Sequence, residues 1–309
     1  NAYLEMDIST SNLILRSTIV FFLSTLPSAL TLLLIFRILR RNNFSKSISV
    51  FTSLIFGFGT IILFYSTVYM GNSLAMFLGF LAFYLLEKEA PSGREKFLAG
   101  ILAGYAIVTE YHTIIIPLFI TLYLLTDGID TKNLRSSLLS AKNYLGPLKF
   151  ISGTLTGISP LFIYNYFITG NPLVPVVSLK STTRPIVLEV LQDISSGYGS
   201  TFPEFVFSLI TLSPKDFFFS SFLLSPDTVT ISLRILAGLE RGLLVYSPIL
   251  FLVIPGLYYL YKEKSRLALS ITGISLAFII FNALYIGWWG GAVFGPKYLL
   301  PIIPFLSIP

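Results

Sequence analysis

Long stretches without any charged side chain dominate this sequence. The longest covers 40 residues, 47–86. A helix needs about 20 apolar residues to cross the roughly 30 Å hydrocarbon core of a bilayer. This stretch is therefore long enough for two crossings, with a turn between Tyr65 and Asn72, where polar residues gather. We expect a protein that crosses a membrane several times.

Other apolar runs predict the remaining crossings. Residues 97–125 are too many for one upright helix and too few for two full ones, and Glu110 and His112 stand at their middle. We therefore expect two short helices that meet at this point, surrounded by protein or by a water-filled cavity. The other predicted spans are residues 17–36, 150–169, 242–261, 267 to about 288, and a truncated span from about 298.

Composition agrees with this interpretation. Apolar residues make up 54% of the chain and charged residues 12%, and the mean hydropathy is +0.80. The predicted fold is an all-α, polytopic transmembrane bundle forming one domain over residues 1–309, which we expect to be an excerpt of a longer chain. Because the chain has no cysteine, disulfides, thiolate metal sites and thiol nucleophiles are excluded.

The basic residues fall in short clusters between the apolar runs. Alternating crossings place 14 of the 21 Lys and Arg on one side, which the positive-inside rule makes cytoplasmic. Because these residues do not share one solvated face, nucleic acid is excluded as a partner and membrane lipids are expected instead. The basic loops are residues 37–46, 87–96, 127–149 and 262–266.

The extracytoplasmic side then receives the segment from Asn171 to Arg241 and the loop that contains Trp288 and Trp289. The segment mixes apolar and aromatic runs with Pro and charged residues, which is typical of helices lying on the membrane surface. No symmetric pair of interrupted helices is visible, and this weakens a transporter interpretation.

Two candidate sites involve ionisable residues near apolar spans. Glu110 and His112, the only histidine, lie two residues apart at the predicted helix break. Such groups are costly in a membrane unless they face a polar cavity, so they are candidates for proton transfer; a helix cap is the alternative.

Lys297 is the only charge between Leu267 and Pro309, beside Trp288, Trp289 and Tyr298. It suits an anionic headgroup, and an aromatic belt with a polar turn is the alternative.

Further candidates lie at the same predicted face. Arg241 could hold a phosphate with its planar guanidinium or anchor the chain at the interface with Glu240. Tyr164 and Asn165 could bind a sugar hydroxyl or end a helix. Glu5 and Asp7 form an acidic pair before the first span that could act as a base or bind a metal. A solvated acidic loop is the alternative for this pair.

Five segments, in order, resemble a recurring pattern in the polytopic type C glycosyltransferases, the protein O-mannosyltransferase-like and lipid A aminoarabinose transferase-like enzymes. They are FYSTVYMGNSLAMFL (64–78), AGILAGYAIVTEYHTIIIPL (99–118), YNYFITGNPL (164–173), RGLLVYSPILFLVIPGL (241–257) and WWGGAVFGPKYLLPIIPFL (288–306). The resemblance implies transfer of a hexosyl or pentosyl group from a polyprenyl (dolichyl-type) phosphate to an unknown acceptor at the outer face.

The resemblance also implies roles for single residues. Lys297 matches the basic position that faces the lipid phosphate, Arg241 matches the basic residue of the RGLL pattern, and Glu110 matches an acidic residue in the equivalent helix break. Asn72 stands where such proteins often carry His or an acidic residue. In this family the catalytic carboxylate follows the first transmembrane helix. We expect that helix, and the carboxylate after it, to precede Asn1, so Glu5 or Asp7 could act only as a substitute for this carboxylate.

Two functions from different classes follow. The first is the glycosyltransferase, in which fixed cations stabilise the leaving phosphate and a carboxylate takes the acceptor proton. No nucleotide is needed in this scheme, no cofactor is certain, and a divalent Mg or Mn ion stays open. The second is a transporter or flippase for a lipid-linked or small anionic solute, with Glu110 and His112 as a proton relay.

Overall fold

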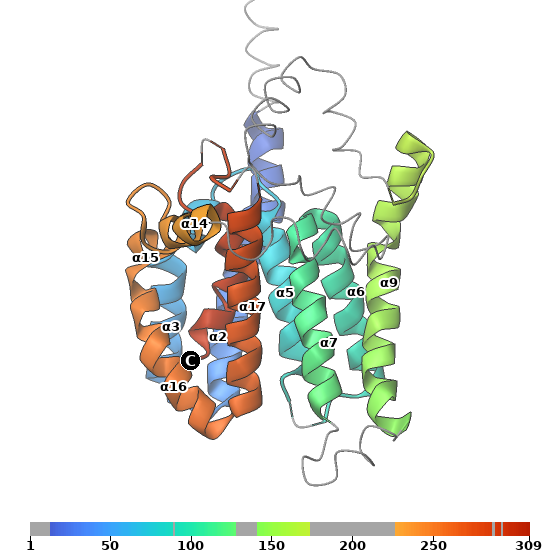
Figure 1. Ribbon diagram of the computed structural model, residues 1–309, viewed down its shortest axis with the longest axis horizontal. Helices are drawn as coiled ribbons and strands as arrows, with labels where there is room; N and C mark the ends of the chain where they lie inside the picture. The colour runs from blue at the N-terminus through green and yellow to red at the C-terminus, as the bar shows by residue number, and fades with distance from the viewer. Residues whose placement is uncertain (1–12, 89, 128–140, 174–225, 286–287, 292) are drawn as a thin grey trace, which may run out of the picture.

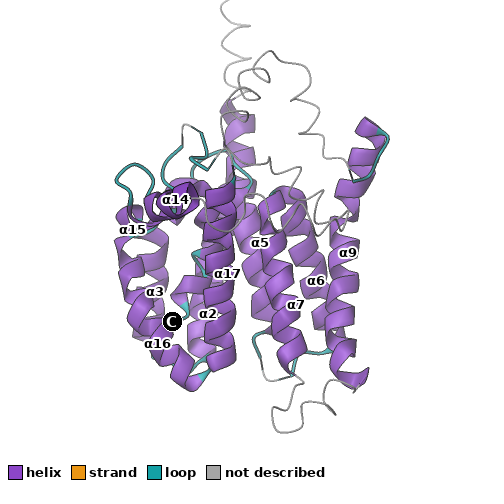
Figure 2. Ribbon diagram, viewed as in Figure 1, coloured by secondary structure: helices purple, strands orange, loops and turns teal. Residues whose placement is uncertain are grey.

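The computed structural model describes residues 13–88, 90–127, 141–173, 226–285, 288–291 and 293–309. All regular secondary structure in these ranges is helical, and Figure 2 shows no strand among them. The expected all-α fold is thereby confirmed for the described part of the chain.

The first helix runs without interruption over Leu13–Arg41. It contains a π-helical turn, η1 (Phe21–Thr25), and continues as α2 (Leu26–Arg41). The next elements are α3 (Lys46–Phe58), α4 (Ile62–Tyr65), α5 (Asn72–Leu86), α6 (Gly93–Thr109), the 3-10 helix η2 (Tyr111–Ile114), α7 (Ile115–Asp127) and α9 (Ala141–Thr169). After the gap come α14 (Pro226–Ala237), α15 (Leu243–Tyr246), the 3-10 helix η4 (Pro248–Leu252), α16 (Val253–Glu263), α17 (Ser265–Leu284), and the 3-10 helices η5 (Lys297–Ile302) and η6 (Phe305–Ser307).

The long helices stand side by side in a bundle, with α5, α6, α7 and α9 in one half and α2, α3, α16 and α17 in the other (Figure 1). The two halves meet where α2 packs on α5 and where α17 packs on α7. Gly79 lets α5 approach Ile116 of α7, and Gly273 lets α17 approach Phe119. Small residues therefore set the distances between several helices.

The closest pairing in the bundle joins α6 to α9. Each helix contributes two glycines spaced four residues apart, Gly100 and Gly104 on α6 and Gly153 and Gly157 on α9. A Cβ atom added at any of the four would collide with a backbone carbonyl of the other helix. This is the small-xxx-small packing that membrane helices use to bring their backbones together, and it makes α6 and α9 one unit.

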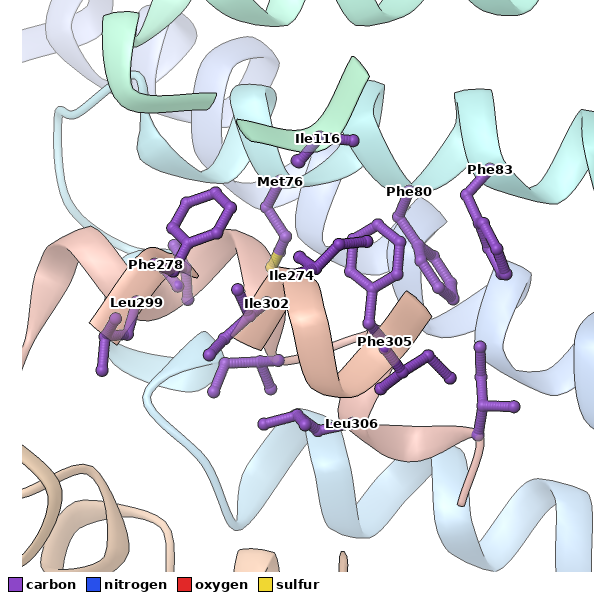
Figure 3. Close-up of a cluster of buried hydrophobic side chains, with 14 of the residues drawn as sticks. Met76, Phe80, Phe83, Ile116, Ile274, Phe278, Leu299, Ile302, Phe305 and Leu306 are labelled. Atoms are coloured by element: carbon purple, nitrogen blue, oxygen red, sulfur yellow. The ribbon is translucent and has the colours of Figure 1, made fainter. Parts of the chain in front are cut away.

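The last described segment, residues 297–309, lies inside the bundle. Here η5 packs against α5 and α17, and nearly all of its apolar side chains are buried. In Figure 3 the Phe305 ring lies next to the rings of Phe80 and Phe83 of α5. Leu299 and Ile302 lie on the side of the cluster where Phe278 is drawn. The ring centroids of Phe80 and Phe305 are 5.3 Å apart. The segment is therefore part of the core.

The basic loops gather at one end of the bundle, which we call the basic end. Arg41 donates to the backbone carbonyl of Glu87 and lies 3.6 Å from its carboxylate. Lys264 donates to the Asn42 side chain, and Arg266 donates to the Tyr123 carbonyl. The predicted basic loops 37–46, 87–96 and 262–266 are thus linked by hydrogen bonds at the basic end, and loop 262–266 also contacts the end of α7.

The opposite end, which we call the site end, holds the turns between the helices. Ser24, in the π turn of the first helix, donates to the carbonyls of Val68 and Met70 at 2.6 and 3.2 Å. Ser73 donates to the Tyr65 carbonyl at 2.8 Å. The turn predicted between Tyr65 and Asn72 is therefore confirmed, and it is fixed to the first helix.

Two of the helices are long and apolar enough to cross a membrane, Leu13–Arg41 and Ser265–Leu284. Four shorter apolar helices accompany them in the described ranges: Lys46–Phe58, Asn72–Leu86, Tyr111–Thr126 and Thr228–Ala237. Large apolar side chains point outward along the bundle, such as Phe51, Leu118 and Leu155 with 66%, 58% and 59% of their surface exposed. Such continuous apolar exposure is rare in water and fits a lipid environment.

Two predicted spans are wrong as continuous helices. Residues 242–261 divide into α15, η4 and α16, because Pro248 lacks the N–H that an uninterrupted helix needs. Residues 298–309 form two 3-10 turns, with Pro301 and Pro304 acting in the same way. The helix predicted to reach about Trp288 ends at Leu284. The helix break in residues 97–125 is confirmed, but α6 and α7 run antiparallel from it, so it lies at the end of the bundle.

Most of the segment from Asn171 to Arg241 lies outside the described residues. Its helix α14 packs against α17 and lies crosswise at the site end in Figure 1. This orientation agrees with a surface helix, and the role of the whole segment stays a prediction.

The α6–α9 contact makes a stability prediction. Gly157→Leu should separate the two helices, because the neighbouring atoms are backbone atoms of Ile101 that cannot rotate away. We expect a cost of about 3 kcal/mol or more, at the upper end of overpacking effects. The measurement is the thermal midpoint of the detergent-purified protein. The control is Thr156→Leu, an exposed neighbour on α9, and equal midpoints for the two variants would contradict the prediction.

Candidate functional site

The helix break at Glu110 places a carboxylate at the site end. Glu110 has an extended backbone (φ −146°, ψ 111°) that ends α6. Its carbonyl accepts hydrogen bonds from the Thr113 amide at 3.0 Å and from the Thr113 hydroxyl at 2.8 Å, which start the 3-10 turn η2. Its side chain lies beside the start of α5, where a Cβ built on Gly71 would be 3.6 Å from Oε1. The break therefore aims the carboxylate at an N-terminal helix end, which favours negative charge.

His112 lies next to Glu110 and is surrounded by aromatic rings. Its ring is 5.3 Å from that of Tyr298, 5.7 Å from that of Phe278 and 6.1 Å from that of Phe281. Its Nδ1 is 3.7 Å from a Glu110 oxygen, and only 4% of the residue is exposed. His112 therefore lies next to Glu110 without a hydrogen bond between the two side chains, and it is enclosed by protein rather than open to solvent.

Lys297 reaches the same place from the loop after α17. Gly290, Gly291 and Gly295 have φ values of +74°, +83° and +62°, a region that residues with a Cβ rarely adopt. At Gly290 a Cβ would also lie 3.1–3.2 Å from the aliphatic chain of Lys297. The glycines thus shape a loop across which the lysine lies, and its Nζ sits 4.8 Å from the centre of the Tyr298 ring.

Arg241 holds this loop from the other side. Its guanidinium donates to the carbonyls of Gly291, at 2.7 Å, and of Val293, with a longer contact of 3.5 Å to Gly295. Tyr65 donates to the Phe294 carbonyl at 2.9 Å. The phosphate-binding role expected for Arg241 is not what its contacts favour, because several of its donors are used to hold the loop that carries Lys297.

Glu110 and Lys297 interact electrostatically without forming an ion pair within 4 Å. Burial raises the pKa of the Glu110 carboxyl to about 7, and the positive charge of Lys297 limits this rise. Burial lowers the pKa of Lys297, and Glu110 opposes that shift. A carboxyl with this pKa exchanges protons near neutral pH, as a general acid or base must.

The structure places the other candidates as follows. Asn72 is buried at the first turn of α5, next to Gly71. Asn165 is buried, and its amide donates to the Pro172 carbonyl at 3.2 Å, so it closes the turn after α9. Tyr164 is exposed and interacts electrostatically with Tyr111, the neighbour of Glu110.

The two tryptophans differ in their surroundings. Trp288 packs against the core, whereas Trp289 is largely exposed and meets Trp288 edge to face at 6.2 Å. Glu5 and Asp7 lie outside the described residues. The structure thus brings Glu110, His112, Lys297 and Tyr298 together and leaves Tyr164 and Trp289 nearer the surface.

Three residues of this region have no motif that sequence reasoning would recognise. Tyr285 meets Tyr298 edge to face at 5.3 Å, Tyr65 is fully buried under the loop, and Asn282 is fully buried in α17. The available signal was weak, because polar residues near the ends of apolar runs also end helices without any function.

The described residues contain no group of three or more His, Cys, Asp or Glu side chains that could hold a metal ion. Glu110 with one histidine is a poor set for Mg or Mn, which prefer several oxygen ligands. The involvement of a divalent ion stays a prediction.

Comparison with known families agrees with the resemblance. Residues 10–156 match the sequence model of the family described as dolichyl-phosphate-mannose-protein mannosyltransferase. The match covers the first helix, the turn at Asn72, the break at Glu110 and α9 up to Thr156. The resemblance to membrane glycosyltransferases that use lipid-phosphate sugars is thereby confirmed over this part of the chain. No curated protein and no solved structure matches the chain.

The contacts of Arg241 predict a structural role. Arg241→Met should leave the carbonyls of Gly291 and Val293 without these donors and loosen the loop that carries Lys297. We expect faster hydrogen–deuterium exchange in peptides covering residues 293–298, with little change in α6. Lys262→Met, at the basic end, is the control. Unchanged exchange in Arg241→Met would show that the loop holds itself.

Proposed function

We propose that this chain is an integral-membrane glycosyltransferase that transfers a sugar from a polyprenyl phosphate to an acceptor at the extracytoplasmic face. One observation carries the proposal. A partly buried carboxylate and a lysine, Glu110 and Lys297, interact electrostatically at one end of an apolar bundle, in a chain whose residues 10–156 match a family of such transferases.

The distribution of charge supports the sidedness. The basic loops meet at one end, and Glu110 and Lys297 lie at the other. By the positive-inside rule the basic end is cytoplasmic, and the chain is then a multi-pass protein with its site, the segment from Asn171 to Arg241 and the tryptophan loop outside. A lipid donor can reach such a site from the outer leaflet without entering water.

Lys297 would bind the donor phosphate. When the bond between the anomeric carbon and the phosphate oxygen breaks, the electron pair stays on that oxygen and negative charge grows there. A fixed cation next to this oxygen stabilises the transition state more than the ground state. Arg241 would act through the loop, by keeping Lys297 in position, and Trp289 would contact lipid or acceptor at the surface.

Glu110 would take the proton of the acceptor. The acceptor hydroxyl attacks the anomeric carbon, its oxygen forms the new glycosidic bond, and its proton passes to the carboxylate. The carboxyl must be ionised before it can do so, and His112 behind it would fix its orientation. The polyprenyl phosphate leaves with the electron pair of the broken bond, so no nucleotide is needed.

The alternative, a transporter or flippase with Glu110 and His112 as a proton relay, is less well supported. The His112 ring is enclosed by Phe278, Phe281 and Tyr298, and only 4% of the residue is exposed to exchange a proton with solvent. Flux in proteoliposomes that depends on pH and disappears in Glu110→Gln, without release of dolichyl phosphate, would favour it.

Loss of Lys297 should weaken transfer. Lys297→Met should lower kcat/KM by about 10²-fold or more, the usual effect of removing one donor from a developing oxyanion, whereas Lys297→Arg should keep most of the activity. The measurement is release of dolichyl phosphate from dolichyl phosphate sugars by the purified protein with a mixture of acceptors. Lys262→Met at the basic end is the matched control. Equal rates for the wild type and Lys297→Met would remove the proposal.

The pKa of Glu110 sets a pH dependence. A carboxyl with a pKa of about 7 is mostly protonated below that pH, so its activity as a base should rise through neutral pH and level off above it. In Glu110→Gln the rate should fall, and the remaining rate should not follow this rise. Glu95→Gln is the control, because Glu95 is a partly exposed carboxylate in the capping box with Ser92 at the basic end. A wild-type rate that falls through neutral pH would contradict the assignment.

A further inference from the structure

Asn72 and Asn282, like Asn165 after α9, are buried asparagines at the site end with an amide atom that has no hydrogen-bond partner among the described residues. Asn282 is completely buried, and neither its Nδ2 nor its Oδ1 is hydrogen-bonded. Asn72 is 2% exposed, and its Nδ2 has no partner. Most buried polar side-chain atoms in proteins are hydrogen-bonded, so each exception needs an explanation.

Asn282 belongs to the face of α17 that lines the candidate site. It lies one helical turn beyond Phe278 and just before the turn that holds Tyr285, and residues four apart share a helix face. Phe278 contacts the His112 ring, and Tyr285 contacts the Tyr298 ring. The Asn282 amide therefore lies at the level of His112 and Tyr298.

Asn72 holds the corresponding position on α5. It lies one turn before Met76, toward the site end, and both residues are buried. Its neighbour Gly71 lies beside the Glu110 side chain, since a Cβ built on Gly71 would be 3.6 Å from Oε1. Both α5 and α17 pack against η5, which begins with Lys297 and Tyr298. The two amides thus come from the site ends of two helices that both pack against η5.

We propose that the amides of Asn72 and Asn282 bind hydroxyl groups of the donor sugar whose phosphate Lys297 binds. This inference rests on the proposed function and names the part of the site that recognises the sugar. A small number of polar groups in an apolar and aromatic wall is the usual composition of such a site. The amides supply donors and an acceptor, and the rings of Tyr298 and Phe281 supply the wall.

This assignment explains why Nδ2 of Asn72 and both amide atoms of Asn282 have no partner in the described part of the chain. A site built to hydrogen-bond a substrate hydroxyl leaves its own polar groups unpaired when the hydroxyl is absent, and for this reason it discriminates strongly. Lys297 can attract any lipid phosphate, so the sugar must be recognised by other groups. Asn72 and Asn282 are uncharged, and they lie deeper in the bundle than the partly exposed Lys297.

The test compares binding of donors with and without the sugar. Dolichyl phosphate and dolichyl phosphates carrying mannose, glucose or galactose are titrated into the detergent-purified protein by calorimetry. At least one sugar-bearing form should bind the wild type more tightly than dolichyl phosphate does. In Asn282→Leu and in Asn72→Leu this preference should fall by about tenfold or disappear, while binding of dolichyl phosphate stays unchanged.

Stability separates binding from folding. The amide of Asn282 has no partner to lose among the described residues, so Asn282→Leu, which has the same number and branching of side-chain heavy atoms, should not lower the thermal midpoint without ligand. Asn42 at the basic end is the matched control, because its side chain is hydrogen-bonded to Ile38 and Lys264. Asn42→Leu should lower the midpoint and keep the preference for the sugar. If Asn282→Leu does not fold, Asn282→Ala replaces it in the titrations.

Each outcome is decisive. An unchanged sugar preference in both asparagine variants, or no preference for any of the three sugars in the wild type, overturns the inference while leaving phosphate binding by Lys297 intact. Failure of every dolichyl compound to bind, or equal binding to the wild type and Lys297→Met, removes the proposed function itself. Loss of the preference with unchanged binding of dolichyl phosphate supports the assignment.

Discussion

The backbone contact between α6 and α9 is the interaction on which the rest of the arrangement depends. Gly100 and Gly104 face Gly153 and Gly157 without any side chain between the two helices, so the position of α6 is fixed within a narrow range. Because α6 ends at Thr109, this contact also fixes the place of Glu110. The neighbouring helix α5 packs on α6, and its start at Gly71 adjoins the Glu110 carboxylate.

The second half of the site comes from the C-terminal part of the chain. The 3-10 helix η5 fills the space between α5 and α17, and it begins with Lys297 and Tyr298. Arg241 and Tyr65 fix the preceding loop through its carbonyls. A lysine and a carboxylate therefore lie near each other at the end of an apolar bundle. Partial removal from water raises the pKa of Glu110 and lowers the pKa of Lys297, which favours the neutral form of each.

Sequence reasoning predicted the helical class, the turn between Tyr65 and Asn72 and the helix break at Glu110, because these depend on the lengths of apolar runs and on local residue types. It failed for residues 242–261, where Pro248 divides a run that hydropathy alone makes continuous. It also left the role of Arg241 open, since a guanidinium binds a phosphate or backbone carbonyls equally well in principle. Asn282 carried no signal, because one Asn in an apolar helix belongs to no motif.

By itself the sequence determined that the chain forms apolar helices with basic loops and that a carboxylate, a histidine and a lysine stand at their interruptions. These properties follow from residue composition and spacing along the chain. Only the tertiary structure decided which interruptions meet, because the contact of residues near 110 with residues near 297 depends on the packing of helices far apart in sequence. It also decided that Arg241 donates to the carbonyls of a loop and that amide atoms of Asn72 and Asn282 lie buried without partners among the described residues, since hydrogen bonding and burial are properties of the folded arrangement.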